Sequence, residues 1–416
     1  MSPDKKKIRI GFILLVFYIS IMSGIPIKAA GDELKLLPSI AVKEEYNDNI
    51  LYTIAQPKSD FITTVSPGFA FINRTEKMDI TLSGRLDRLF YSKYSEFDTT
   101  DQYYDGIGKY AVTERFNISG KALYSKTSRP DRDLETTGIP LGPATRERQN
   151  YGISGTYALT EKTAATLSYE YLNDNYDAER FVDSESHLVN LGFVHDLTYF
   201  ARSTKGRFNL GYARYNMTGS KIDNYEATIG FSRDLSEKWN LLIDGGARYT
   251  YWKFQVTDVQ RTVFDPTTPP FFFPIFAEQE KTTSELGAVA RLNLNYKWER
   301  TNAGFNFGYD LSSPSGRTGS VERTSLALNV NTRFLYELLA ILSGGYFFNK
   351  SSEVGIGTKV DEETLWITPG IRYEWSKDIL MEISYTYNRT RYNTVREYTD
   401  RNLFLVYFRV QHDLFN

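Results

Sequence analysis

Residues 235–252, LSEKWNLLIDGGARYTYW, alternate between apolar and polar side chains with a period of two. From Trp239 onward the apolar residues fall on one side of an extended chain, and residues such as Asp244 and Arg248 fall on the other. In a water-soluble sheet the apolar face is buried against a second layer. In a barrel that crosses a membrane the apolar face contacts lipid and the polar face lines the lumen. The number of such segments and their connections decide between the two.

The same alternation recurs along the rest of the chain in segments of about 11 to 15 residues. The pattern predicts about 18 strands, within a range of about 16 to 18, and barrels made of one bacterial chain use even numbers. The strands are expected to begin near residues 36, 61, 77, 102, 115, 149, 163, 186, 206, 223, 238, 283, 301, 322, 337, 362, 378 and 399.

The connections between these segments alternate in length. Compact charged turns such as VTER at 112 and LTEK at 159 alternate with long polar connections near 126–148, 173–185, 253–282 and 350–361. Short periplasmic turns and long extracellular loops are typical of a transmembrane, antiparallel, up-and-down barrel. A secreted β-solenoid or sandwich is the alternative, but neither explains why loop length is segregated by end. The predicted fold class is therefore all-β, a transmembrane barrel over residues 31–416.

The composition agrees with this fold and excludes other classes. The chain of 416 residues has a net charge of −2, so no global basic field indicates a nucleic-acid partner. It has no cysteine, which excludes disulfides and thiolate chemistry. Aromatic residues make up 15% of the chain, and Tyr and Trp favour membrane interfaces. Girdles facing lipid and lipopolysaccharide are expected at Tyr151, Tyr171, Trp239, Tyr249, Trp298, Tyr309, Trp375 and Tyr387.

Residues 1–30 have the pattern of a Sec-type signal peptide. A basic stretch with Lys5 and Arg9 precedes an apolar run at 10–22, and Ala29 and Ala30 offer a small-residue cleavage site. An uncleaved anchor is the alternative. Either would take the rest of the chain out of the cytoplasm, so the outer membrane is the predicted location.

The polar face of the strands carries charges of both signs, which would set the selectivity of a lumen. Because the planar guanidinium suits carboxylates and phosphates, Arg248, Arg291 and Arg372 could line a track for an anionic sugar polymer. Alternatively, these charges form ordinary salt bridges across the lumen. The candidate lumen-lining residues are Arg85, Asp87, Lys121, Glu170, Asp244, Arg248, Arg291, Arg372 and Glu382.

The 253–282 connection is the candidate for a segment that occludes the lumen. It carries Pro266, Pro269, Pro270 and Pro274 around the phenylalanines at 271–273. This cluster either folds into the barrel or forms a surface loop packed on its own aromatic rings. The sequence leaves both possibilities open.

No catalytic, cofactor-binding or metal-binding residues are predicted. His187 lies beside Ser184 and Ser186, but neighbours in sequence do not make a catalytic triad. The stretches YNDN at 46–49 and DRD at 131–133 offer oxygen ligands without the spacing of a calcium loop, so they are expected to be solvated turn and loop residues. The chain is therefore not expected to be an enzyme.

The segment 36–71, LLPSIAVKEEYNDNILYTIAQPKSDFITTVSPGFAF, resembles the opening of the β-barrel porin group that is associated with exosortase (PEP-CTERM) systems and exopolysaccharide loci. The resemblance implies an outer-membrane barrel that serves polysaccharide export or the biofilm matrix, with polysaccharide-export components as expected partners. One departure is that the chain ends in Phe415 and Asn416 instead of a terminal aromatic residue. The matching positions are Glu44, Glu45, Tyr46, Asp48, Asn49, Ile50, Asp60, Phe61, Ser66, Pro67 and Gly68.

These patterns together predict a pore for passive diffusion, or for export of a polysaccharide or other polar solute. The alternative is a structural or adhesive barrel whose lumen is occluded and whose extracellular loops do the work. The sequence does not indicate the solute or the oligomeric state.

Overall fold

The computed structural model describes residues 33–130, 132–140, 142–264, 272–313, 316–351 and 360–415. The predicted signal peptide at 1–30 lies outside these residues and stays a prediction. Within the described part of the chain, no helix is both long enough and apolar enough to cross a membrane.

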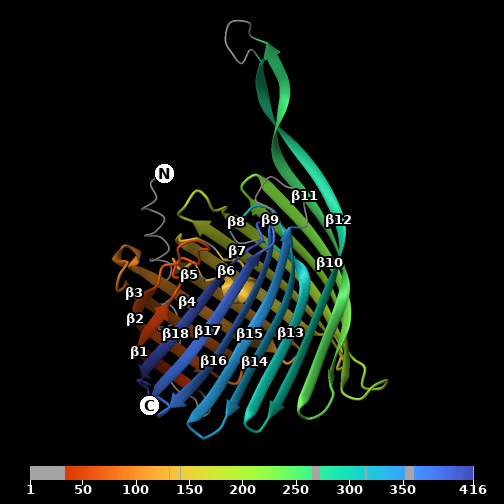
Figure 1. The fold of residues 1–416 in the computed structure, drawn as a ribbon. Coiled ribbons are helices and arrows are strands. Elements are labelled where there is room, and N and C mark those ends of the chain that lie inside the picture. Colours follow the sequence, from red (N-terminus) through yellow and green to blue (C-terminus); the bar gives the residue numbers. More distant parts are fainter. Residues whose placement is uncertain are drawn as a thin grey trace, which may run out of the picture.

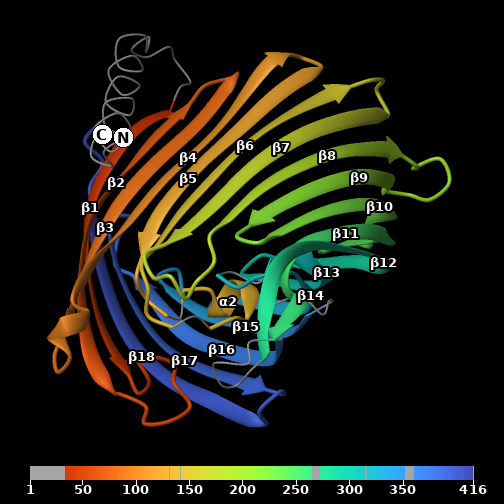
Figure 2. The same ribbon diagram turned by 90° about the horizontal axis from the view of Figure 1, so that it is seen from above.

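The described chain forms one 18-stranded antiparallel sheet in which each strand pairs with the next, and β1 also pairs with β18. This last pairing closes the sheet into the barrel seen in Figures 1 and 2. The predicted fold class and strand number are confirmed. The strands are β1 Glu33–Asn47, β2 Asp60–Arg74, β3 Met78–Tyr91, β4 Thr99–Thr113, β5 Phe116–Thr127, β6 Arg146–Ala158, β7 Thr163–Tyr176, β8 Ser184–Asp196, β9 Thr204–Met217, β10 Ser220–Asp234, β11 Trp239–Phe264, β12 Phe272–Trp298, β13 Thr301–Ser312, β14 Val321–Arg333, β15 Leu338–Ser351, β16 Asp361–Glu374, β17 Ile379–Tyr392 and β18 Glu397–Gln411.

The exposure of alternate residues shows which face of the sheet is inside. On β1, Ile40 and Val42 are 52% and 44% exposed, whereas Glu45 and Asn47 are 1% and 2% exposed. The apolar side chains therefore point outward and the polar ones inward, the reverse of a water-soluble sandwich. Trp239, Trp298 and Trp375 are exposed where strands meet turns, as expected for an aromatic girdle. A closed barrel with this surface is built to span a membrane.

Loop length differs between the two ends of the barrel. Even-numbered strands lead to the next strand through short turns, apart from a longer one at 197–203. Most odd-numbered strands are followed by longer connections, but 218–219 and 393–396 are tight turns as well. The end with the short turns is called the turn end below, and the opposite end is called the loop end. The termini of the sheet, at the start of β1 and the end of β18, lie at the turn end.

Residues 253–282 were expected to be a long connection that either closes the lumen or forms a surface loop, and for the described part the expectation of a connection is wrong. β11 and β12 continue as a paired hairpin up to Phe264 and Phe272, with one irregularity between Val259 and Arg261. The base of the hairpin is still bonded to the wall, because Lys253 and Phe254 pair with β10 and the Gln255 N–H donates to the Gly219 carbonyl. Beyond that point the two strands satisfy each other's backbone groups. Figure 1 shows it rising well beyond the other strands. This part, 253–264 and 272–282, is called the outer hairpin below; residues 265–271 lie outside the described residues.

The interior is packed at the loop end, where connections meet the inner faces of strands. Three clusters of buried apolar side chains lie there. They are Ile139, Val321 and Val360; Met217, Ile222, Trp252 and Leu311; and Ile50, Ile62 and Leu89.

Candidate pore constriction

The connection between β5 and β6, residues 128–145, folds into the barrel; it is called the inner segment below, and its residues 131 and 141 are not described. It contains the short helix α2 (Leu134–Thr137), which Figure 2 shows inside the ring of strands. Gly138 ends the helix with φ +69°, and a Cβ atom there would lie 2.4 Å from Cβ of Phe347. Glycine is therefore required both by the left-handed turn and by the close approach to the wall.

Hydrogen bonds tie the end of α2 to strands far away in the sequence. The amide of Asn349 on β15 donates to the Thr137 carbonyl at 2.9 Å, and the Thr364 hydroxyl on β16 donates to the Gly138 carbonyl at 2.5 Å. Both donor side chains are fully buried. The polar backbone of α2 is thus satisfied by polar groups of the lumen wall.

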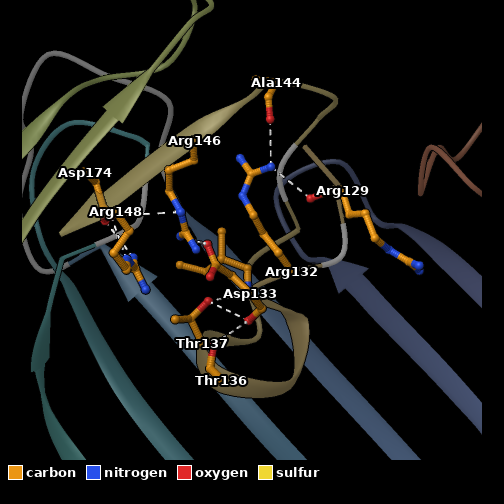
Figure 3. Close-up of polar contacts among 10 residues, drawn as sticks. Arg129, Arg132, Asp133, Thr136, Thr137, Ala144, Arg146, Arg148 and Asp174 are labelled. Carbon is orange, nitrogen blue, oxygen red and sulfur yellow. Dashed lines mark hydrogen bonds and ion pairs between the residues drawn. The ribbon is translucent and has the colours of Figure 1, made fainter. Parts of the chain in front are cut away.

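Ion pairs tie the start of the inner segment to nearer strands. Asp133 accepts a 2.6 Å hydrogen bond from Arg146 at the start of β6, and both residues are buried (Figure 3). Arg129 donates to both carboxylate oxygens of Glu45 on β1, at 3.0 and 2.7 Å. Arg132 donates to carbonyls within the segment itself. The inner segment is therefore anchored on both sides of the lumen.

Strand register places the nine predicted lumen residues on the inner face. Thr364 contacts the inner segment, so it marks the inner face of β16. Residues paired across antiparallel strands share a face. Stepping from Thr364 through its paired neighbours on β15, β14 and β13 reaches Arg291 on β12 and Asp244 on β11. The same reasoning applies to the other seven residues; that they line a conducting path stays a prediction.

All nine of these residues take part in ion pairs. Arg248, Arg291 and Arg372 are each paired with a carboxylate and do not form a row of free guanidinium groups. The arrangement therefore agrees with the alternative, in which these charges form ordinary salt bridges. The pairs are Arg85–Asp87 at 2.8 Å, Lys121–Glu170 at 2.7 Å, Arg207–Asp244 at 3.0 Å, Arg248–Glu322, Arg291 with Glu226 at 2.8 Å and with Asp310 at 2.6 Å, and Arg372–Glu382 at 2.7 Å.

Two of these pairs cross an intervening strand at a glycine. Lys121 reaches Glu170 over Gly152 of β6, and a Cβ atom on that glycine would lie 2.7 Å from the lysine side chain. Arg248 is paired with Gly287 in register and reaches Glu322 on β14; a Cβ atom there would lie 2.5 Å from the guanidinium carbon. The glycines leave room for long side chains to lie flat on the wall.

The anchors of the inner segment were not among the predicted site residues. Asp133, expected to be a solvated loop residue, is 1% exposed, so that expectation is wrong. Burial is tolerated because the carboxylate is paired with Arg146. The sequence feature that could have indicated these anchors is the high density of Arg and Asp in a long connection that also holds the short helical stretch 134–137.

The histidine beside two serines makes no catalytic arrangement. His187 contacts the Tyr169 hydroxyl at 2.9 Å and a Glu185 carboxylate oxygen at 2.8 Å. Ser184 and Ser186, an odd number of positions away on the same strand, point to the opposite face of the sheet. No group of His, Asp and Glu suited to a metal ion occurs among the described residues.

These features define the class of the protein as a membrane-spanning β-barrel whose lumen holds an inner segment. No family model matches the sequence, and no match was found among curated proteins. The resemblance to the porin group of exosortase loci therefore stays a prediction.

The barrel is similar to three solved structures of bacterial barrels, all at low sequence identity. The ferric-catecholate import receptor Fiu from E. coli K12 is 7% identical, covers 90% of this chain and 81% of its own, and has a TM-score of 0.45. OccK2 from Pseudomonas aeruginosa is 7% identical, with coverage of 92% and 100% and a TM-score of 0.44. The siderophore receptor PiuA from Acinetobacter baumannii is 9% identical, with coverage of 91% and 82% and a TM-score of 0.46. Such distant similarities carry no argument about function, and the class rests on the barrel's own geometry.

Proposed function

We propose that this protein is an outer-membrane channel through which polar solutes diffuse, with the inner segment as its constriction. The observation that carries the proposal is the inner segment itself, held across a polar lumen by Asp133–Arg146 on one side and by Thr364 on the other. A barrel of 18 strands is wide enough to enclose water unless something fills it. Residues 1–30 would direct the chain to the envelope.

The mechanism needs no covalent chemistry. Polar groups on the wall replace part of the hydration shell of a solute, and the paired charges create a transverse field that orients dipolar solutes. The inner segment limits solute size. The resemblance of residues 36–71 to barrels of exopolysaccharide loci makes an extended polysaccharide chain one candidate solute.

The test is the single-channel conductance of the refolded barrel in a planar bilayer, measured beside a variant in which 130–143 is replaced by a short Gly-Ser linker. Steady conductance steps in the wild type, with larger steps in the variant, are expected. Block of the current by an added acidic polysaccharide supports the polysaccharide candidate, and indifference to the polymer leaves small polar solutes. A barrel that is silent in both forms contradicts the channel.

A second candidate function is surface attachment through the outer hairpin. The observation that favours it is the length of β11 and β12, which have 26 and 27 residues while the other strands have at most 15. Removing residues 256–278 would abolish binding of cells or matrix to this surface and leave the conductance unchanged. Unaltered attachment after the deletion would exclude this role.

A further inference from the structure

A cavity of about 480 Å³ opens on the inner face of the wall at the turn end, away from the inner segment. It lies where the turns after β12, β14 and β16 approach each other. Its size falls in the range of pockets that hold small organic ligands. Arg300, Arg333 and Arg372 supply three guanidinium groups to its lining.

These guanidinium groups keep donors that the described contacts do not use. Glu382 accepts from Nε and Nη2 of Arg372, which leaves Nη1. Arg333 donates through Nη1 to the Tyr336 carbonyl and through Nη2 to Glu374, which leaves Nε. Arg300 is exposed and has no ion-pair partner among the described residues. The cavity therefore presents cationic donors that an incoming anion could engage.

The other lining residues narrow the class of ligand. Asn302 and Asn331 are register partners and offer neighbouring amides, which suit hydroxyl groups. Leu339 and Ile341 add an apolar patch for the C–H face of a ring. Glu299 also lines the cavity, so its negative charge favours a singly charged ligand over a phosphate dianion.

From this lining we propose that the cavity binds a monocarboxylate sugar, with the acid group on Arg300 and the hydroxyl groups on the two asparagines. The inference rests on the proposed channel function, because a site at the turn end of the lumen would hold a solute as it enters or leaves the channel. The planar guanidinium group of Arg300 can donate two parallel hydrogen bonds to a carboxylate, and this interaction favours an acidic sugar over a neutral one.

The experiment is isothermal titration of the refolded full-length barrel in detergent with glucuronate, glucose and inorganic phosphate in turn. Glucuronate is expected to bind more tightly than either of the others. Arg300→Ala should weaken glucuronate binding by about tenfold, the loss expected for one charge-assisted contact. Arg115→Ala, in the exposed turn after β4 at the same end but outside this cavity, is the matched control and should leave binding unchanged.

The outcomes separate this proposal from the channel itself. Conductance without glucuronate binding overturns the sugar-acid site and leaves the channel standing. Binding that Arg300→Ala weakens in a barrel that never conducts supports the site and overturns the channel. If glucose binds as tightly as glucuronate, the arginines do not recognise the acid group and the proposal is overturned. If phosphate binds more tightly than glucuronate, the proposed preference for a carboxylate ligand is wrong.

Discussion

The inner segment and the outer hairpin leave the barrel wall at the same end and take opposite directions. Residues 128–145 fold back into the lumen, and α2 lies within the ring of strands (Figure 2). β11 and β12 instead continue past the loop end as a paired ribbon that rises beyond the other strands (Figure 1). The described part of 253–282 is thus not the segment that enters the barrel.

Complementarity to the wall explains the difference better than apolar content does. Arg129 and Asp133 of the inner segment find partners of opposite charge in Glu45 and Arg146. A polar lumen wall offers such partners to charged groups. The outer hairpin pairs its own backbone and adds the cross-strand ion pair Lys253–Glu280, at 2.7 Å. Beyond its base its backbone therefore needs no partner from the barrel wall.

The largest expected effect comes from deleting each region in turn. Replacing 130–143 by a short linker should raise the single-channel conductance by about twofold or more, because the barrel width and not the segment would then limit the current. Deleting 256–278, with a tight turn in its place, should leave the conductance near that of the wild type. Larger conductance after the hairpin deletion alone would reverse the assignment of the constriction.

The alternation of side chains predicted the barrel well because it is a local signal. The expected strand starts at 163 and 301 coincide with the observed ones, and most others differ by one to three residues. The large error is β12, expected near 283 and found to begin at Phe272, because the aromatic cluster hid the continuing strand. Period and turn chemistry are enough to set an antiparallel neighbour-to-neighbour order.

The contacts of the inner segment could not be predicted in the same way. Thr364 and Gly138 are 226 positions apart, and nothing in either local stretch indicates the other. The sequence could predict that the inner face of the wall carries ion pairs, because charged side chains of both signs alternate onto that face. Their particular crossings, such as Arg248 over Gly287 to Glu322, depend on the register of four strands at once.

The second prediction compares one ion pair in each region. Asp133→Ala should lower the free energy of unfolding by about 3 kcal/mol, because the buried Arg146 loses its hydrogen-bonded carboxylate and keeps only the longer ion pair with Asp174, at 3.9 Å. Glu280→Ala in the outer hairpin should cost about 1 kcal/mol or less, since both partners there are exposed. Urea unfolding of the barrel refolded in lipid vesicles measures both. Similar losses would mean that the lumen solvates Asp133 as well as bulk water solvates the hairpin.

The third prediction concerns the wall at the base of the outer hairpin. Gly287→Ala should destabilise the barrel by about 1–3 kcal/mol, because the added Cβ atom displaces the buried Arg248 from its path to Glu322. Gly245→Ala is the matched control, since a Cβ atom there meets nothing within 4 Å. The same urea unfolding applies. If both variants behave alike, the glycine is not what lets the arginine cross the strand.

The smallest effect is expected where the wall carries charge but the inner segment does not touch it. Arg85 pairs with Asp87 on its own strand, and its side chain is 52% exposed, against 0% for Arg248. Solvent screens such a pair, so Arg85→Ala should change the free energy of unfolding by about 1 kcal/mol or less. The difference between wild type and variant should shrink further at high salt. A loss as large as that of Asp133→Ala, unaffected by salt, would show that water does not reach this part of the wall, and the lumen would then be closed well beyond the inner segment.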